Sequence, residues 1–183
     1  MNERIPMQGE HEKQEVEFRI EAMLTAKGFT IVDRNFEKPW GGYFVIADEQ
    51  THDFIRAFFP EEQEELLVSE EKLSPKILVV GPHLRLSWQY HDRRAELHKV
   101  IEGPVGYPLS ETDDHPEATV YQAGDLIVIP QTVRHRLAGL DTWGVVAEIW
   151  KHTDPHHPSN ELDNTRVSDD FKRTSGSEEI PPQ

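Results

Sequence analysis

Between residues 76 and 150 the sequence alternates short apolar segments with turn residues, at intervals of about 8–12 residues. Such a pattern is typical of a meander of short β-strands, and no helical periodicity interrupts it. It predicts an all-β sandwich or barrel. The expected strands are KILVVG, LRLSWQYH, AELHKVIEG, GYPLS, ATVYQ, DLIVIP, HRLAG and WGVVAEIW, preceded by TIVD at 30–33 and GYFVIAD at 42–48.

The segments outside this meander differ in character. Residues 10–28 predict one amphipathic helix that packs on a larger body, because Val16, Ile20, Met23 and Leu24 share a stripe. The glutamate-rich part of residues 52–72 is interpreted as a solvated face without chemistry. The tail from residue 153 is polar, and its last ten residues are predicted to be disordered.

The formal net charge of −15, from 34 acidic and 19 basic residues, argues against binding of nucleic acid or an anionic membrane. This acidity is uneven, because residues 81–140 carry six Lys and Arg against eight Asp and Glu. A small anionic substrate in a local basic pocket is therefore still compatible with the sequence. No apolar run is long enough to span a membrane, and residues 1–13 lack a signal-peptide core, so we expect a cytoplasmic protein.

The chain has no cysteine and ten histidines, so any metal site must use histidine, carboxylate or amide ligands. Gln89 and His91 are two residues apart and therefore share a strand face, as do Glu96 and His98. His135 begins a strand just after the turn at Pro130.

Each of these residues taken alone has an ordinary structural interpretation. A single histidine in a β protein is most often a hydrogen-bonded core or surface residue, and Glu96 could be a salt-bridge partner of Arg93 or Arg94. The joint spacing across two separated segments is what favours a site for a divalent first-row metal.

The two segments resemble the two motifs of the cupin superfamily. The first reads Gln89-x-His91-x4-Glu96-x6-Gly103, with glutamine where a histidine usually stands. The second reads Gly124-x5-Pro130-x4-His135. The resemblance implies a double-stranded β-helix, or jelly-roll barrel, with an added N-terminal helix and a short C-terminal segment. It divides the chain into an extension (1–35), a barrel (36–152) and a C-terminal segment (153–183) that packs partly on the barrel.

Within the superfamily the chain is most similar to the cupin domain of type II phosphomannose isomerases. The segments that carry this similarity, in order from about residue 36 to 173, are Pro39-Trp40-Gly41, Leu86 to Glu96, Ile129 to Arg136, Ala147-Glu148-Ile149 and Arg166-x2-Asp169-x3-Arg173. His83 and Leu97-His98 depart from the family pattern, and residues 10–28 and 51–72 have no obvious counterpart in the minimal domain. The phosphate loop of the nucleotidyltransferase domain found in bifunctional members is absent, so we do not expect guanylyl transfer.

This similarity implies isomerisation of a phosphorylated sugar, such as mannose 6-phosphate to fructose 6-phosphate, through a cis-enediol. It also implies one divalent ion, zinc first and manganese, cobalt, iron or nickel as alternatives. The implied metal ligands are Gln89, His91, Glu96 and His135.

The other implied roles are less constrained by the sequence. Glu148, among apolar neighbours, is the candidate base, and His98 is a candidate proton shuttle; Lys99 is discounted because strand alternation turns it away. Arg136 and Arg166 are the preferred substrate contacts, Arg136 also counting as catalytic, and Arg94 is a third contact or a structural residue. Trp40 and Trp88 are expected to pack rather than to stack on substrate.

Three alternatives remain open at this point. The chain could isomerise another sugar or sugar phosphate, it could be a cupin dioxygenase, or it could bind sugar and metal without catalysis. The glutamine at position 89 argues against the His-rich dioxygenase site. A homodimer is expected from the fold alone.

Overall fold

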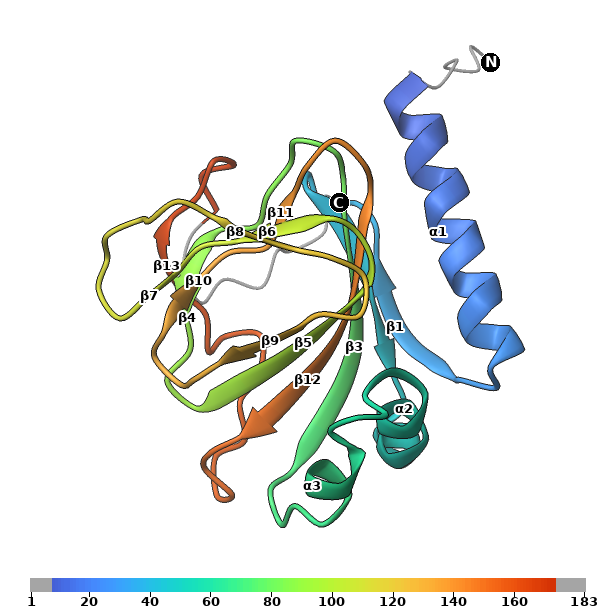
Figure 1. Ribbon diagram of the computed structural model, residues 1–183, viewed down its shortest axis with the longest axis vertical. Coiled ribbons are helices and arrows are strands. Elements are labelled where there is room, and N and C mark those ends of the chain that lie inside the picture. The colour runs from blue at the N-terminus through green and yellow to red at the C-terminus, as the bar shows by residue number, and fades with distance from the viewer. Residues whose placement is uncertain (1–7, 174–183) are drawn as a thin grey trace, which may run out of the picture.

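The computed structural model describes residues 8–173, and most of its regular structure is antiparallel β-sheet (Figure 1). The largest sheet has six strands in the order β1-β2-β3-β12-β5-β9. These strands are β1 (Ile31–Asn35), β2 (Gly41–Ile46), β3 (Leu73–Val80), β12 (Gly144–His152), β5 (Arg94–Glu102) and β9 (Leu126–Ile129). The sheet brings the first and second predicted motifs together, because β5 pairs directly with β9.

Two smaller antiparallel sheets complete the β structure. One has the order β13-β4-β10-β7 and the other β11-β6-β8. Their strands are β4 (Trp88–Tyr90), β6 (Val105–Tyr107), β7 (Leu109–Ser110), β8 (Thr119–Tyr121), β10 (Arg134–His135), β11 (Ala138–Gly139) and β13 (Thr165–Ser168).

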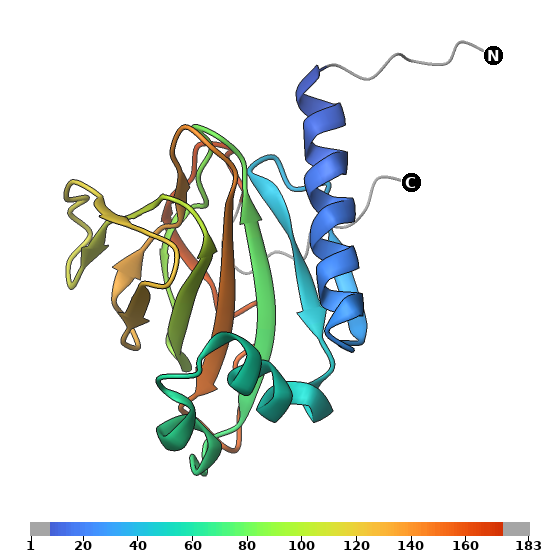
Figure 2. The ribbon, with the colours of Figure 1, turned by 45° about the vertical axis from the view of Figure 1, so that its right-hand side comes forward.

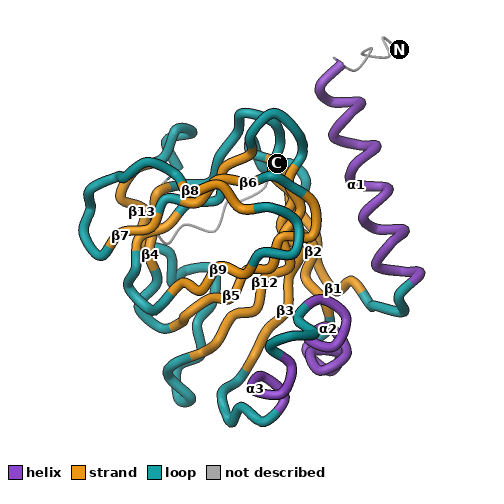
Figure 3. Tube along the Cα trace, in the orientation of Figure 1, coloured by secondary structure: helices purple, strands orange, loops and turns teal. Residues whose placement is uncertain are grey.

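The helices lie on one side of the strands, as Figure 3 shows. They are α1 (Gln8–Ala26), the 3₁₀ turn η1 (Asp48–Gln50), α2 (Thr51–Phe58) and α3 (Gln63–Leu67). In the view of Figure 2 the long strands stand between these helices and the short strands of the smaller sheets. The six-stranded sheet is thus covered on both faces.

Strand alternation divides the buried apolar side chains into two cores. On β12, Val145, Ala147 and Ile149 belong to the core shared with α1 and α2, whereas Val146 belongs to the core shared with the smaller sheets. The neighbouring strand β3 alternates in the same way, with Ile77 in the first core and Leu78 in the second. Polar residues in register with the second core therefore point into the space between the sheets.

Several sequence predictions are confirmed at this level. The helix predicted at 10–28 is α1, and its stripe faces the sheet, with Ile20 and Leu24 fully buried. No residue from 76 to 150 is helical, as the meander predicted. Residues 153–173 pack on the strands through β13, which pairs with β4. The prediction of disorder for the last ten residues lies outside the described range.

Three details differ from the sequence predictions. The segment 51–67 contains α2 and α3, and buried Phe54, Ile55 and Phe58 show the helical spacing that the charge run obscured. Residues 106–110 form two strands that meet at Pro108, which lacks a backbone N–H. Residues 135–139 are also two strands, because β10 pairs with β4 and β7 while β11 pairs with β6.

The division into an extension, a barrel and a C-terminal segment stays a prediction. Residues 31–35 of the assigned extension form β1, which pairs with β2. Among the described residues no helix is both long and apolar enough to cross a membrane.

Substitution of Phe54, in the core between the helices and the sheet, should strongly destabilise the protein. Phe54 is fully buried, with its ring centroid 4.7 Å from Phe58 and 5.7 Å from Phe29. We expect Phe54→Ala to lower the free energy of unfolding by about 3–5 kcal/mol, measured by urea denaturation, because it leaves a cavity. The matched control Phe18→Ala, 73% exposed on α1, should change it by less than about 0.5 kcal/mol. Equal effects of the two substitutions would contradict this account of the core.

Candidate metal and substrate site

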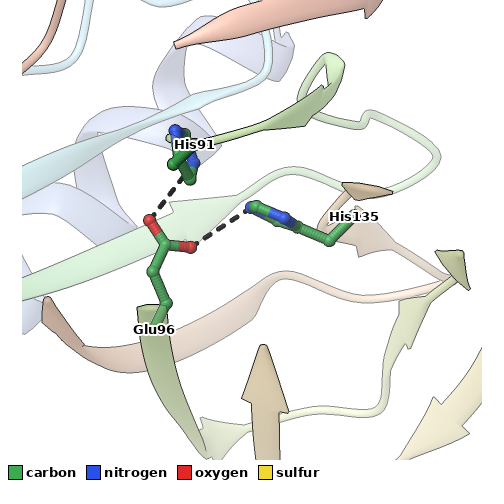
Figure 4. Close-up of side chains that lie close together, drawn as sticks. All are labelled: His91, Glu96 and His135. Carbon is green, nitrogen blue, oxygen red and sulfur yellow. Dashed lines mark ion pairs between the residues drawn. The ribbon is translucent and has the colours of Figure 1, made fainter. Parts of the chain in front are cut away.

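Two histidines and one carboxylate converge between the sheets (Figure 4). The Nε2 atom of His91 lies 3.3 Å from one oxygen of Glu96, and Nε2 of His135 lies 3.2 Å from the other. Glu96 is on β5, His91 follows β4, and His135 ends β10, so three strands from two sheets supply the cluster. All three side chains are buried, and their nearest donor atoms lie within 4.8 Å of one another.

Backbone carbonyls fix the orientation of both imidazole rings. Nδ1 of His91 lies 2.6 Å from the carbonyl oxygen of Asp163, and Nδ1 of His135 lies 3.0 Å from that of Val133. A carbonyl only accepts hydrogen bonds, so each Nδ1 carries the proton and donates it. In the neutral ring each Nε2 then presents a lone pair toward the Glu96 carboxylate.

Such a set of converging acceptors fits a metal ion. Two acceptors at this distance repel each other unless a proton or a cation lies between them. Burial, together with the positive charge of Arg94, holds the pKa of His91 well below its usual value, which favours the neutral imidazole. Burial alone would raise the pKa of Glu96, but its interactions with the His91 imidazole and the Arg94 guanidinium outweigh burial and hold this pKa well below the usual range. Neutral imidazoles and a carboxylate are the forms that bind divalent first-row metals.

Arg94 hydrogen-bonds to two of the atoms that could bind the metal, one on Glu96 and one on His91. Its Nε donates to Glu96 over 2.6 Å, its Nη2 lies 3.0 Å from Nε2 of His91, and its Nη1 donates to Ser159 over 2.9 Å. A metal ion on His91 would replace the Arg94 contact, since an imidazole nitrogen has a single lone pair. Arg94 is therefore placed to neutralise the buried carboxylate and, once displaced, to reach into the neighbouring cavity.

A second group shares the Glu96 carboxylate. Nε2 of His98 lies 3.3 Å from Glu96 and 3.0 Å from Glu148, while Nδ1 lies 2.8 Å from the hydroxyl of Tyr107. His98 and Glu148 are direct partners in the β5–β12 ladder, which explains their contact. Burial by itself would lower the pKa of His98. The hydrogen bonds to the carboxylates of Glu148 and Glu96 have the larger effect, so the pKa is raised to about 9. His98 thus links the Glu96 carboxylate to the candidate base.

Glu148 also lines a cavity of about 80 Å³ between the sheets and the C-terminal segment. The cationic side chains in its wall are Lys38, Lys76, Arg94, Arg166 and Arg173, and its other carboxylate is Glu161. Some of these cations are paired: Lys76 with Glu161, and Arg173 with Asp169 over 2.7 Å. The wall nevertheless carries more positive than negative groups, in a chain whose overall charge is −15.

Most of the site residues predicted from the sequence lie close together in the structure. Gln89 lies opposite His135 in the β4–β10 ladder and lines the cavity, and its amide oxygen accepts a hydrogen bond from Ser87 over 2.5 Å. Its role as a fourth metal ligand stays a prediction. Arg94 and Arg166 line the cavity, and Arg166 lies opposite Gln89 in the ladder between β13 and β4.

Two further basic residues lie away from the cavity. Arg136 is buried against the C-terminal segment, with Nη2 3.5 Å from the carbonyl of Ser168, and the described cavity wall does not include it. The predicted catalytic and substrate-binding role of Arg136 therefore stays a prediction: the residue is buried but does not line this cavity. Lys99 pairs with Glu61 and Glu62 on the outer face, which confirms that it points away.

Sequence reasoning missed the residues that complete the site from a distance. The carboxylate of Asp163 accepts hydrogen bonds from the backbone N–H groups of Asp92 and Arg93, each over 3.0 Å, and its carbonyl orients His91. Trp150 lies beneath two cations, with its ring centroid 3.6 Å from the Arg94 guanidinium and 3.7 Å from Nζ of Lys76. The inward alternation of β12 could have identified Trp150, whereas no local pattern marks Asp163.

No protein-family model and no curated protein sequence matches this chain. Among solved structures it is similar to oxalate oxidase in complex with glycolate, at 20% identity and a TM-score of 0.41 over 45% of this chain and 43% of that one. It is also similar to oxalate decarboxylase of Bacillus subtilis, at 19% identity and a TM-score of 0.49 over 75% of this chain and 30% of that one. A DMSP lyase of Ruegeria pomeroyi gives 16% identity and a TM-score of 0.40 over 52% and 45%. The matched part is less than half of each of those chains, and likenesses this low imply no shared activity.

The geometry predicts that metal binding depends on His91. We expect His91→Ala to lose the bound divalent ion, measured by elemental analysis after dialysis against zinc or manganese, because one of three converging donors is removed. His11→Ala, at an exposed position on α1, is the matched control and should keep the metal content of the unaltered chain. A His91→Ala protein with full metal content would rule out the ligand assignment.

Asp163 should act on the metal indirectly. Asp163→Ala removes the carboxylate that holds the 91–93 loop, so metal affinity should fall by about 10- to 100-fold while saturating metal still fills the site. Competition with a chromophoric chelator measures this affinity. Asp154→Ala, at a half-exposed turn residue in the same segment, should leave the affinity unchanged. Loss of all binding, or no change at all, in Asp163→Ala would contradict an orienting role.

Proposed function

We propose that this chain is a cupin and a metal-dependent aldose–ketose isomerase of a phosphorylated sugar, with mannose 6-phosphate and fructose 6-phosphate as the first pair to test. The observation that carries the proposal is the cavity in which a buried carboxylate, Glu148, faces an excess of cationic side chains beside the His91, Glu96 and His135 cluster. The two cupin-like sequence motifs meet at that cluster, which supports the jelly-roll assignment.

The charge of the cavity suits a phosphorylated substrate. Arg166, Arg173 and Lys38 lie in the wall together with the reactive carboxylate, and guanidinium groups bind phosphate oxygens in a bidentate manner. A sugar phosphate would place its dianionic end on these cations and its carbonyl end toward Glu148. Arg94, which lines the cavity and hydrogen-bonds to Glu96 and His91 of the cluster, would contact oxygens near the reacting carbons.

Proton transfer between C1 and C2 needs one group that removes and returns a proton. Glu148 is the candidate, because it is buried, lines the cavity and is held by a hydrogen bond to His98. His98 in turn contacts the Tyr107 hydroxyl, so a chain of hydrogen bonds supports the base from behind. A divalent ion held by His91, Glu96 and His135, with Gln89 as a predicted fourth ligand, would supply Lewis-acid polarisation of the sugar oxygens.

One observation favours a second candidate function. Two histidines and one carboxylate are also the donor set of non-haem iron oxygenases, so a cupin dioxygenase has the ligands it needs. The cationic cavity wall favours a phosphorylated or carboxylated substrate in either case. Oxygen uptake by the iron-loaded protein would identify the dioxygenase, and metal-dependent binding of sugar phosphate without turnover would identify a binding protein.

The central experiment is a coupled assay for fructose 6-phosphate formed from mannose 6-phosphate. Chelator-treated protein should be inactive, and adding back zinc, manganese, cobalt, nickel or ferrous iron should restore turnover. A panel of other sugar phosphates and free sugars then tests for another isomerase substrate. The isomerase proposal fails if metal-loaded protein turns over none of these and chelation changes nothing.

Substitution of the candidate base gives a sharper test. We expect Glu148→Gln to lower kcat by about 10²- to 10⁴-fold with unchanged metal content, because the amide cannot accept the proton. Glu102→Gln, near the end of β5 and paired with Arg19 at the surface, is the control and should keep full activity. Activity within twofold of the unaltered protein in Glu148→Gln would exclude Glu148 as the base.

A further inference from the structure

The cavity beside Glu148 is small for the ligand that we propose. Its volume is about 80 Å³, whereas pockets that bury small organic ligands usually measure about 300–1,000 Å³. A water molecule takes up about 30 Å³ of the bulk liquid, so the cavity has room for only a few waters. Part of its wall must therefore move before a sugar phosphate can enter.

Most of the wall stands on strands that are held on both sides. Tyr43, Leu78, Arg94 and Glu148 lie on β2, β3, β5 and β12, and each of these strands has two neighbours in the six-stranded sheet. Displacing any of them would break two ladders and open both cores that the sheet separates. These strands are therefore the fixed part of the wall.

The C-terminal part of the wall, residues 164–173, is held more weakly, and we call it the strap. It contributes Asn164, Arg166 and Arg173 to the cavity, and Arg173 pairs with Asp169 within the strap over 2.7 Å. Its strand β13 lies at the edge of a four-stranded sheet, beside β4 (Figure 1). No residue from 164 to 173 is buried. Segments with few buried contacts open locally at a low cost in free energy.

The residue just before the strap is firmly anchored. Asp163 is buried, and its carboxylate accepts hydrogen bonds from the backbone N–H groups of Asp92 and Arg93, each over 3.0 Å, and from the Ser159 hydroxyl over 2.6 Å. Rotation of the strap about this residue would leave these bonds, and the carbonyl contact to His91, in place. Asp163 is therefore the expected hinge.

Asp170 holds the far end of the strap in place. Its carboxylate oxygens accept hydrogen bonds from Arg85 over 2.6 and 3.2 Å, and one of them lies 3.9 Å from Nη2 of Arg136. Arg136 is buried, so the closed strap supplies a counter-charge to this guanidinium, whereas an open strap would expose it to water. Arg85 and Asp170 are both half-exposed, and surface ion pairs of this kind are weak and screened by salt.

We propose that the strap opens about Asp163 to admit the ligand to the cavity, and that Asp170 latches it closed through Arg85 and Arg136. The proposal rests on the proposed function for the size and charge of the ligand. The strap carries two of the cavity's guanidinium groups, so closing would bring both onto a bound anion and exclude bulk water.

Hydrogen exchange of the full chain without ligand, followed by mass spectrometry, measures the opening itself. We expect the amides of β13 and their partners on β4 to exchange together, at least about tenfold faster than those of β12. The amides of Asp92 and Arg93, which are bonded to the hinge, should stay as slow as those of β12. Equal rates in β13 and β12 would overturn the proposal, as would release of the Asp92 and Arg93 amides together with the strap.

Asp170→Asn tests the latch, because it keeps the size of the side chain and removes its charge. Exchange over all of residues 164–168 should become about two- to fivefold faster, the range expected for loss of a surface ion pair. High salt should have the same effect on the unaltered chain and much less on the variant. Asp141→Asn, at a carboxylate that is 95% exposed, is the matched control and should change nothing. Acceleration confined to the neighbours of residue 170 would indicate fraying and contradict a latch.

A disulfide tests whether ligand entry needs the opening. The chain has no cysteine, so Tyr90→Cys with Thr165→Cys introduces one pair of thiols, at opposite positions of the β4–β13 ladder. The Cα atoms of such partners are about 4.5–5.5 Å apart, within the range that a disulfide bridges. Asp33→Cys with Val45→Cys, at opposite positions of the β1–β2 ladder, is the matched control.

The mannose 6-phosphate assay then separates the two proposals. The oxidised strap variant should lose at least about tenfold in kcat/KM and recover on reduction, while the control variant keeps its activity in both states. An undiminished kcat/KM in the oxidised strap variant would reject the strap and leave the isomerase standing. Latched opening seen by hydrogen exchange, in a chain that turns over no sugar phosphate, would retain the strap and reject the isomerase.

Discussion

The antiparallel pairing of β5 with β12 is the constraint on which the rest of the structure depends. This pair lies inside the six-stranded sheet and is buried on both faces. Its outer side chains are mostly apolar and pack against the helices, with Lys99 as a charged exception, and its inner side chains include Glu96, His98 and Glu148. Burying two carboxylates so close together is costly unless each is paired, and His98 and Arg94 provide that pairing. The polar site is thus stabilised by the same ladder that joins the two cores.

The C-terminal segment completes what the strands begin. Asp163 holds the loop after β4 and orients His91, and Ser159 receives a hydrogen bond from Arg94. The same segment contributes Asn164 and Arg166 to the cavity wall. The metal cluster and the cavity therefore share one support, so displacement of residues 153–166 would affect both. This coupling distinguishes the site from a set of ligands carried only by rigid strands.

Charge is distributed unevenly over this acidic chain. The acidic surplus lies largely on the helices, the glutamate-rich segment and the tail, whereas the cavity wall gathers five cationic side chains from separate elements. Such a wall attracts a small anion over a short range, where the distant carboxylates are screened by salt. The donor set of the cluster is compatible with more than one metal reaction, and the cavity combines a buried carboxylate with an excess of cationic side chains.

The sequence by itself determined the β-rich class, the packing helix α1 and the three residues His91, Glu96 and His135, because alternation and motif spacing are local and fix which side chains share a face. It did not determine α2, whose apolar spacing stood beside a run of glutamates, or the break of residues 135–139 between two sheets. Only the tertiary structure decided that Asp163 orients His91, and that Arg94 and Arg166 line the cavity whereas Arg136 does not. These relations join residues far apart in the chain, and their geometry depends on how sheets and the C-terminal segment pack, which no local pattern encodes.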